Sequence, residues 1–158
     1  MTTREVNLES LDLRYGRLRV VDRRQEARLM ASIEEHGQQD AIIVVVGDDG
    51  RFIVMDGHKR VRVLRRLRKD VVTVVVWELD ATQALVAAYR AGSAASYNAI
   101  EEGWLVYELH RVGKWDLGKT AASMGRSRSW ASRRLGLVEE LPEGVVAAVK
   151  RGEIGAWA

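Results

Sequence analysis

Arginine, serine and small residues recur at fixed intervals in one segment of the sequence, Asp116–Leu137. Ala121 and Gly125 are four positions apart, and Ala131 follows six positions after the glycine. A small residue at 121 lets two helices approach closely, and a glycine at 125 permits a tight turn with positive φ. The spacing therefore predicts a helix-turn-helix, the arrangement that places a second helix in the major groove of DNA.

The second helix of this segment carries the side chains that could read DNA. Ser127 or Ser129 can cap it, while Ala131 and Leu135 would point inward and Trp130 would pack between helices. Arginine pairs bidentately with guanine, and serine can bond several bases or a phosphate. The predicted DNA-binding residues are Arg128, Ser129 and Arg133 near bases, Lys119, Arg126 and Arg134 mostly on phosphates, and Ser127 and Ser132. An ordinary helical hairpin with a basic surface is the alternative.

A second basic segment begins at Asp56-Gly57. From His58 to Lys69 there are seven Lys or Arg and no acid. The sequence predicts a strand that ends at the glycine and a helix that starts there. Backbone amides at a helix N-terminus, beside a glycine and several cations, form an anion site for which phosphate is the natural ligand. A surface helix with exposed arginines is the alternative.

The hydrophobic pattern predicts the elements that position these segments. They fall into two parts of the chain. Alternating or β-branched runs predict strands at 6–13, 41–46, 51–55 and 71–79, with a hairpin turn at 47–50. Helices are predicted from Asp22, as the cap, to Gly37, and from 57 to about 69. After Asp80 only helices follow: 81–90, 100–112, two short ones and a third before Pro142, and 145–150, with a small-residue linker at 92–97. The order indicates an α+β fold followed by an all-helical domain.

Composition excludes several classes of chemistry. The 158 residues are 47% hydrophobic and 30% charged, and the net charge is +3. The absence of cysteine removes disulfides, thiolate metal sites and cysteine nucleophiles. The three histidines, His36, His58 and His110, lack the spacing of metal ligands. We predict no metal ligands and no catalytic residues in the chain. No apolar run approaches the roughly 20 residues of a membrane span, and no signal peptide is evident, so we expect a cytoplasmic protein without membrane partners.

The order of short motifs resembles that of the ParB/KorB partition proteins over nearly the full chain. Residues 31–39 are similar to the end of that family's first helix, and Gly57–Val63 stands where the family has Gly-Glu-Arg-Arg-x-Arg-Ala. Ile100–Gly103 is similar to the family's Ile-Glu-Glu-Ala, and the helix-turn-helix, Leu141-Pro142 and 151–154 follow in the family's order.

The resemblance implies a small mixed-sheet ParB/sulfiredoxin-like domain at 1–92 and a KorB-like helix-turn-helix domain at 93–158. It also implies CTP with Mg²⁺ as ligand, double-stranded DNA as partner, a homodimer, a partition ATPase as a further partner, and a nucleoid- or plasmid-associated role in partition or mobile-element regulation. By position, the residues that would bind nucleotide are Arg19, Gln38, Gly57, His58, Lys59, Arg60 and Arg62.

The chain departs from the family in its nucleotide motifs. His58 replaces the family's glutamate, and Arg90–Ala94 lacks the polar residues of its Glu-Asn-x-x-Arg motif. The sequence stops at Gly155–Ala158, inside a stretch where the family continues, which suggests either a fragment or a short relative. The alternative function is an enzyme of the same superfamily that processes nucleotide or nucleic-acid phosphate, such as an NTPase, kinase or nuclease; sulfiredoxin chemistry is excluded because it needs cysteine.

Overall fold

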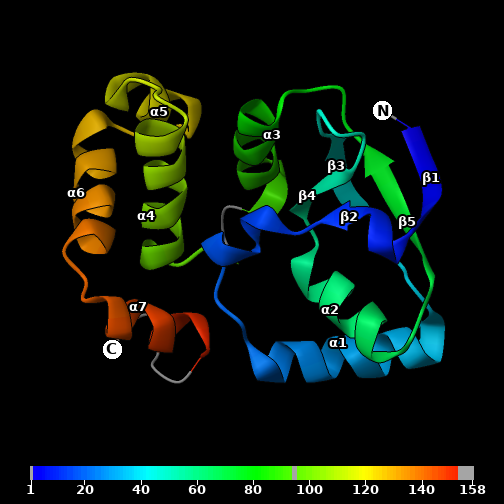
Figure 1. Ribbon diagram of the computed structural model, residues 1–158. Coiled ribbons are helices and arrows are strands. Elements are labelled where there is room, and N and C mark those ends of the chain that lie inside the picture. Colours follow the sequence, from blue (N-terminus) through cyan, green and yellow to red (C-terminus); the bar gives the residue numbers. More distant parts are fainter. Residues whose placement is uncertain (1, 94–95, 153–158) are drawn as a thin grey trace. The chain divides into compact units, whose positions relative to one another are not determined.

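The computed structural model describes residues 2–93 and 96–152, and the chain divides into two compact units. Unit 1 comprises residues 1–16 and 21–84, and unit 2 comprises residues 17–20 and 85–158 (Figure 1). Unit 1 holds all the strands, whereas the described part of unit 2 is helical. The α+β fold class predicted from the hydrophobic pattern is therefore confirmed.

A mixed five-stranded sheet forms the centre of unit 1. Its strands are β1 (Thr2–Asn7), β2 (Leu11–Asp12), β3 (Ile42–Val46), β4 (Phe52–Asp56) and β5 (Val71–Val76). They lie in the order β1-β5-β3-β4-β2, with β1/β5 and β3/β4 antiparallel and β3/β5 and β2/β4 parallel. The sheet thus combines a hairpin with crossover connections, which parallel pairs require.

The hairpin and the central strands agree with the prediction. The prediction of a single strand at 6–13 is wrong. The structure breaks this stretch with a 3-10 turn at Leu8–Ser10, so that β1 and β2 lie at opposite edges of the sheet. Leu8 and Leu11 are both buried. Residues three apart share one side of a 3-10 turn, so this turn buries a pair that the pleat of a strand would place on opposite faces.

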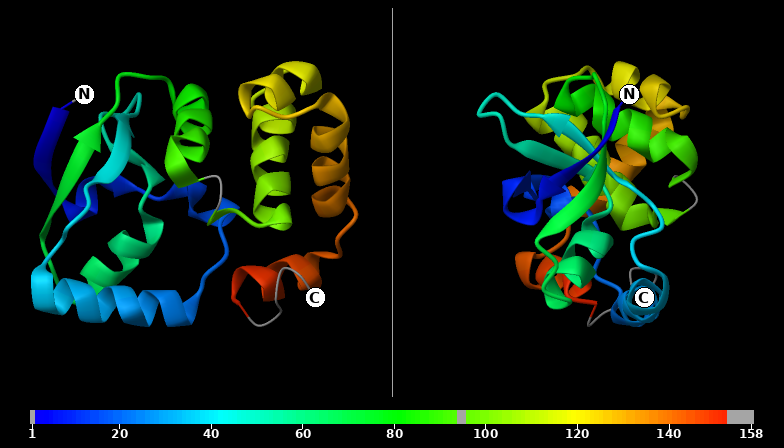
Figure 2. Two further views of the ribbon diagram at one scale, coloured as in Figure 1. Left: turned by 180° about the vertical axis from the view of Figure 1, so that it is seen from behind. Right: turned by 90° about the vertical axis from the view of Figure 1, so that its right-hand side faces the viewer.

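Helices α1 (Arg23–His36) and α2 (His58–Arg66) pack side by side (Figures 1 and 2). The predicted cap is confirmed, because the Asp22 side chain accepts hydrogen bonds from the amides of Arg24 and Gln25, each at 3.1 Å. Gly37 ends α1 with φ +72°. Helix α2 ends three residues earlier than expected, since Arg68 adopts a left-handed φ of 57° and turns the chain. The buried core of this unit includes Ile33, Ile42, Val44, Val54, Val61, Val63, Leu64 and Val74.

Within residues 77–93 and 96–152, five α-helices follow the last strand. They are α3 (Ala81–Ala88), α4 (Ala99–Tyr107), α5 (Leu117–Ser123), α6 (Arg128–Glu139) and α7 (Glu143–Lys150), with π-helical turns at Tyr89–Ser93 and Glu108–Val112. Only two helices, not three, separate Gly113 from Pro142, because Gly136 keeps a helical backbone and α6 runs through it. The expected linker at 92–97 falls partly on residues 94–95, and the chain end at 155–158 falls wholly outside the described residues.

Among the described residues, no helix combines the length and the apolar character that crossing a bilayer requires.

Helices α4 and α6 run in opposite directions (Figure 1), and they approach each other closely at Gly103. A Cβ atom added to Gly103 would lie 2.5 Å from the carbonyl oxygen of Arg134 and 2.7 Å from Cγ1 of Val138. Real Cβ atoms do not approach so closely, so glycine at this position sets the distance between the two helices.

We expect Gly103→Ala to lower the free energy of unfolding by about 1–3 kcal/mol, because the added methyl group forces α6 away from α4. Gly136→Ala is the matched control in α6, where an added Cβ meets no atom within 4 Å. That change should raise stability by about 0.5–1 kcal/mol through helix propensity. Urea unfolding followed by circular dichroism measures both, and equal stability of the two variants would contradict the close packing.

Candidate nucleic-acid interface

The helix-turn-helix of unit 2 is built from local capping interactions. The Asp116 side chain accepts from the amide of Lys119 at the start of α5, and the Ser127 side chain accepts from the amide of Trp130 at the start of α6. Between them Gly125 adopts φ +73°, and the amide of Arg126 donates to the carbonyl of Ala121 at 2.8 Å. The predicted cap at Ser127 and the positive φ at Gly125 are therefore confirmed.

Helix α6 has one buried side and one exposed side. Trp130, Ala131 and Leu135 are buried, as the sequence predicted. The opposite side exposes the side chains predicted to approach bases, together with a further serine: Arg128, Ser129, Ser132 and Arg133. Within the described residues, neither Arg128 nor Arg133 makes an ion pair or a side-chain hydrogen bond. Both guanidinium groups are therefore available to an anionic partner.

Arg126 and Arg134 are placed differently from the other arginines of this segment. The Arg134 Nε lies 3.3 Å from Oε1 of Glu102, and Arg126 Nη2 lies 3.6 Å from Oε2 of the same carboxylate. Both guanidinium groups also stack on the ring of Trp130, at 4.9 Å for Arg126 and 5.3 Å for Arg134. These two arginines, expected mainly on phosphates, thus fasten the start and middle of α6 to α4.

Glu102 is buried on α4 and has a third partner. The hydroxyl of Tyr89, which is itself buried, donates to Glu102 Oε2 at 2.5 Å, and Arg126 Nη2 lies 3.5 Å from the same hydroxyl. Burial raises the pKa of Tyr89, the bond to the carboxylate raises it further, and Arg126 opposes the shift. The result is a four-residue network of Tyr89, Glu102, Arg126 and Arg134 between α4 and α6.

The fifth cation of the predicted interface is Lys119, in the first turn of α5. Its ammonium lies 4.2 Å from the ring centre of Trp115, and the side chain is exposed. A cation–π contact at an exposed site is weak, about 0.5–1 kcal/mol, so it does not prevent Lys119 from meeting a phosphate.

Removing the Tyr89 hydroxyl should change how stability depends on pH. A tyrosine whose pKa is raised in the folded state contributes its full stability below the unfolded pKa of about 10, and this contribution is lost as pH rises through the folded pKa. Wild-type stability should therefore fall more steeply than that of Tyr89→Phe between about pH 9.5 and 11.5. Urea midpoints across this range measure the difference. Tyr107→Phe, at an exposed tyrosine, is the control; if all three proteins show the same slope, the network does not hold the Tyr89 proton.

The predicted anion segment of unit 1 begins at Gly57, which precedes α2 with φ +113°. An added Cβ at Gly57 would meet Ile42 Cγ1 at 3.1 Å, so both the backbone angle and the close neighbour favour glycine. The helix that follows has its first amides next to this glycine, as the sequence predicted.

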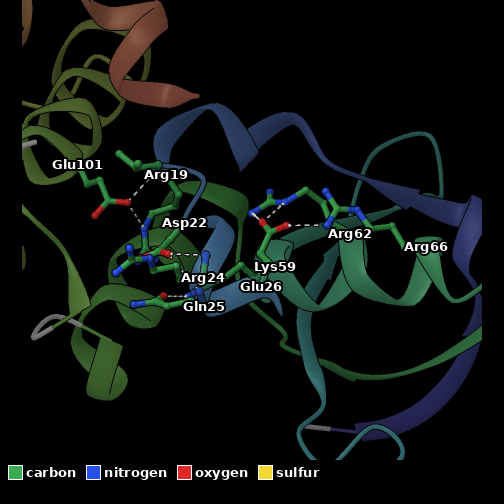
Figure 3. Close-up of polar contacts among 10 residues, drawn as sticks. Arg19, Asp22, Arg24, Gln25, Glu26, Lys59, Arg62, Arg66 and Glu101 are labelled. Atoms are coloured by element: carbon green, nitrogen blue, oxygen red, sulfur yellow. Dashed lines mark hydrogen bonds and ion pairs between the residues drawn. The ribbon is translucent and has the colours of Figure 1, made fainter. Parts of the chain in front are cut away.

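The first three cations of this segment, Lys59, Arg60 and Arg62, have acceptors inside unit 1, and Figure 3 shows those of Lys59 and Arg62. Lys59 Nζ donates to Gln25 Oε1. Arg60 donates to the carbonyl of Ala41 at 2.9 Å and lies 3.4 Å from Asp56 Oδ2. Arg62 donates through Nε to Glu26 at 2.6 Å. The segment supplies positive charge for an anion, but these internal bonds must give way before the cations meet one.

The other residues assigned to nucleotide by the resemblance lie in structural contacts. The Gln38 amide donates to the carbonyl and accepts from the amide of Thr73, which ties the end of α1 to β5. His58 is buried with its ring against Gly16. Arg19 belongs to unit 2, where it donates to Glu101 at 2.9 Å and covers the ring of Tyr97 at 3.8 Å. In the described part of the chain, no group of three or more Asp, Glu or His residues could hold a metal ion.

Sequence reasoning missed the roles of Glu26 and Glu102, two of the four buried glutamates in the described residues. A signal for Glu26 exists, because Leu29, Met30 and Ile33 follow it at intervals of three, four and seven, which puts all four on one side of a helix. A carboxylate at an apolar-face position requires a cation beside it. Spacing along the chain does not identify which cation.

An α+β unit with a basic helix N-terminus, followed by a helical unit with a helix-turn-helix, is the arrangement of ParB-like proteins. Residues 1–92, more than half of the chain, match the family model described as ParB N-terminal domain, so the chain belongs to the ParB N-terminal domain family.

Known relatives cover most of the chain. It is 24% identical over 151 residues to a putative replication protein B of Sinorhizobium fredii, a match of 94% of this chain and 46% of that protein; the chain spans less than half of this relative's length. It is similar to C-terminally truncated ParB from Caulobacter crescentus complexed with CTP-γ-S, at 25% identity and TM-score 0.52, over 99% of this chain and 89% of that one. The same protein complexed to the centromeric parS site matches at 23% identity and TM-score 0.51, over 97% and 80%.

Proposed function

We propose that the chain is a DNA-binding protein of the ParB/KorB type that recognises a specific duplex site through α5 and α6. The observation that carries this proposal is the exposed side of α6, where Arg128 and Arg133 stand clear of internal carboxylates among the described residues. A helix of this kind enters the major groove with the residues near its N-terminus on base edges. Arg128 and Ser129 are the first two residues of α6, and Arg133 lies on the same exposed side.

The charges of the helix-turn-helix divide into two groups under this proposal. Arg128 and Arg133 contact bases or phosphates directly, and Lys119 meets a phosphate. Arg126 and Arg134 act indirectly, since their bonds to Glu102 fix the orientation of α6. A rigid, correctly placed helix is what base recognition requires, because each bidentate arginine–guanine pair depends on planar alignment.

The proposed role is in plasmid or chromosome partition, or in the control of a mobile element. It is supported by the family and by similarity to a ParB bound to its centromeric site and to a putative replication protein. In this proposal the chain acts as a homodimer on a palindromic site, because a two-fold pair of recognition helices reads two half-sites. A partition ATPase is the proposed further partner, and the nucleoid or a plasmid is the proposed location.

We also propose that unit 1 binds CTP with its phosphates at the N-terminus of α2. The support is the positive φ of Gly57, the cations Lys59, Arg60 and Arg62, and the CTP analogue in the similar ParB. The amides of the first turn and the cations suit a phosphate group. The described residues offer no cluster of carboxylates for Mg²⁺, so this chain's own contribution is to the phosphates.

Arg128→Ala should weaken binding to the preferred duplex by about 5- to 150-fold, because one arginine–base contact is worth about 1–3 kcal/mol. The duplex is first selected from a random library and labelled, and affinity is measured by fluorescence anisotropy at two salt concentrations. Binding should also fall as salt rises, since phosphate contacts release counterions.

Arg28→Ala is the matched control, an exposed arginine on α1 that changes the charge equally. It should bind the selected duplex with nearly wild-type affinity. If wild type binds no duplex at about 50 mM salt, or if the two variants lose affinity equally, the proposed recognition by α6 is wrong.

A further inference from the structure

Glu26 is the most deeply buried acid described in unit 1, with 1% of its side chain exposed. It lies on α1 on the side that packs against α2. Its Oε1 lies 2.6 Å from Nε and 2.5 Å from Nη2 of Arg62, so one oxygen receives both donors of the guanidinium edge (Figure 3). This fork is a strong, charge-assisted contact.

The second oxygen of Glu26 is poorly satisfied. Glu26 Oε2 is buried without a hydrogen bond, and Arg66 Nη1 lies 3.7 Å from it, beyond hydrogen-bond distance. A pair whose only task was to stabilise the fold would be expected to satisfy both oxygens, because a buried oxygen without a donor costs free energy. The ion pair between Glu26 and Arg62 therefore holds α1 against α2 at a cost in folding free energy.

The two arginines are far more accessible than the carboxylate between them. The Arg62 side chain is 30% exposed and that of Arg66 is 59% exposed, whereas Glu26 is sealed from solvent. An anion arriving from solvent can reach both guanidinium groups. It meets them with their positive charge already compensated from inside the protein.

The neighbouring cations face weaker acceptors. Lys59 is bonded to a neutral amide oxygen, and the short bond of Arg60 is to the neutral carbonyl of Ala41. Arg62, by contrast, has the almost fully buried carboxylate of Glu26 as its partner. The strongest internal competitor for an anion at the start of α2 is therefore Glu26.

We infer that Glu26 is a built-in competitor for polyphosphate: its carboxylate holds Arg62, one turn into α2, and thereby sets the affinity of the α2 N-terminus for phosphate groups. The inference rests on the phosphate site of the proposed function and adds the residue that tunes it. An incoming triphosphate must take Arg62 from Glu26, so binding is weak in the wild-type chain, and loss of this one negative charge strengthens it.

Glu26→Gln tests the inference, because the amide keeps the shape and one acceptor but removes the charge. Its dissociation constant for inorganic tripolyphosphate, measured by isothermal titration calorimetry on the full chain, should fall by about tenfold or more. Glu34→Gln is the matched control: it removes an equal charge from an exposed position on the same helix, and it should change the constant by less than about threefold, since solvent screens exposed charges. CTP and tripolyphosphate run in parallel show whether the gain belongs to the phosphates alone or includes a base.

The double variant Glu26→Gln/Arg62→Ala separates competition from a general charge effect. Without Arg62, the gain from the glutamine substitution should largely disappear. The inference is overturned if Glu26→Gln folds, as judged by circular dichroism, and binds tripolyphosphate no more tightly than wild type. It is also overturned if neither protein binds tripolyphosphate.

A measurement on wild type covers the case in which the variant does not fold. Saturating tripolyphosphate should shift the Arg62 Nε–H resonance in a ¹⁵N correlation spectrum, because this donor leaves Glu26; an unmoved resonance overturns the inference. Duplex binding by wild type and Glu26→Gln is measured separately. Loss of DNA recognition by α6 would sink that part of the proposed function without bearing on Glu26.

Discussion

The carboxylate of Glu102 lies buried beneath the turn between α5 and α6, and the position of α6 depends on it. Breaking a buried ion pair by removing one partner costs about 3–5 kcal/mol, so Glu102 must keep its partners. Arg126, Arg134 and Tyr89 supply them from three different elements. Their bonds, together with the close approach at Gly103, fix α6 against α4 and leave its other side to carry Arg128 and Arg133 outward.

Unit 1 has a similar arrangement, in which Glu26 is the buried carboxylate. In both units a helix carries a carboxylate on its buried side, and two arginines converge on it: Arg62 and Arg66 from α2 in unit 1, and Arg126 from the turn before α6 with Arg134 from α6 in unit 2. The basic clusters of the sequence therefore carry less free positive charge than their composition suggests. Two arginines in each cluster are partly neutralised from within, so the remaining cations carry the larger share of the free positive charge.

Local features were predictable from the sequence, and long-range pairings were not. Each predicted cap and turn depends on a few consecutive residues, so the sequence alone is enough to predict it. These features are the cap at Asp22, the end of α1 at Gly37, the turn at Gly125 and the cap at Ser127. The bond from Gln38 to Thr73 spans 35 positions and the contact of Arg62 with Glu26 spans 36. Such partners are chosen by packing, which residue types alone do not specify. The break at Leu8–Ser10 was missed because its apolar spacing nearly fits a strand.

The short segment 17–20 has a consequence for how the chain folds during synthesis. Arg17 pairs with Glu108 at 2.9 Å and Arg19 pairs with Glu101 at 2.9 Å, so this early segment belongs to the later helical unit. Strand β1 likewise cannot form its hydrogen bonds until its partner β5, at 71–76, has been synthesised. Domains generally fold as units while the ribosome elongates the chain at about 5–20 residues per second. The sheet can thus close once residue 76 has emerged, whereas Arg19 and Arg17 stay without Glu101 and Glu108 for 25 and 32 residues longer, roughly one to six seconds at that pace.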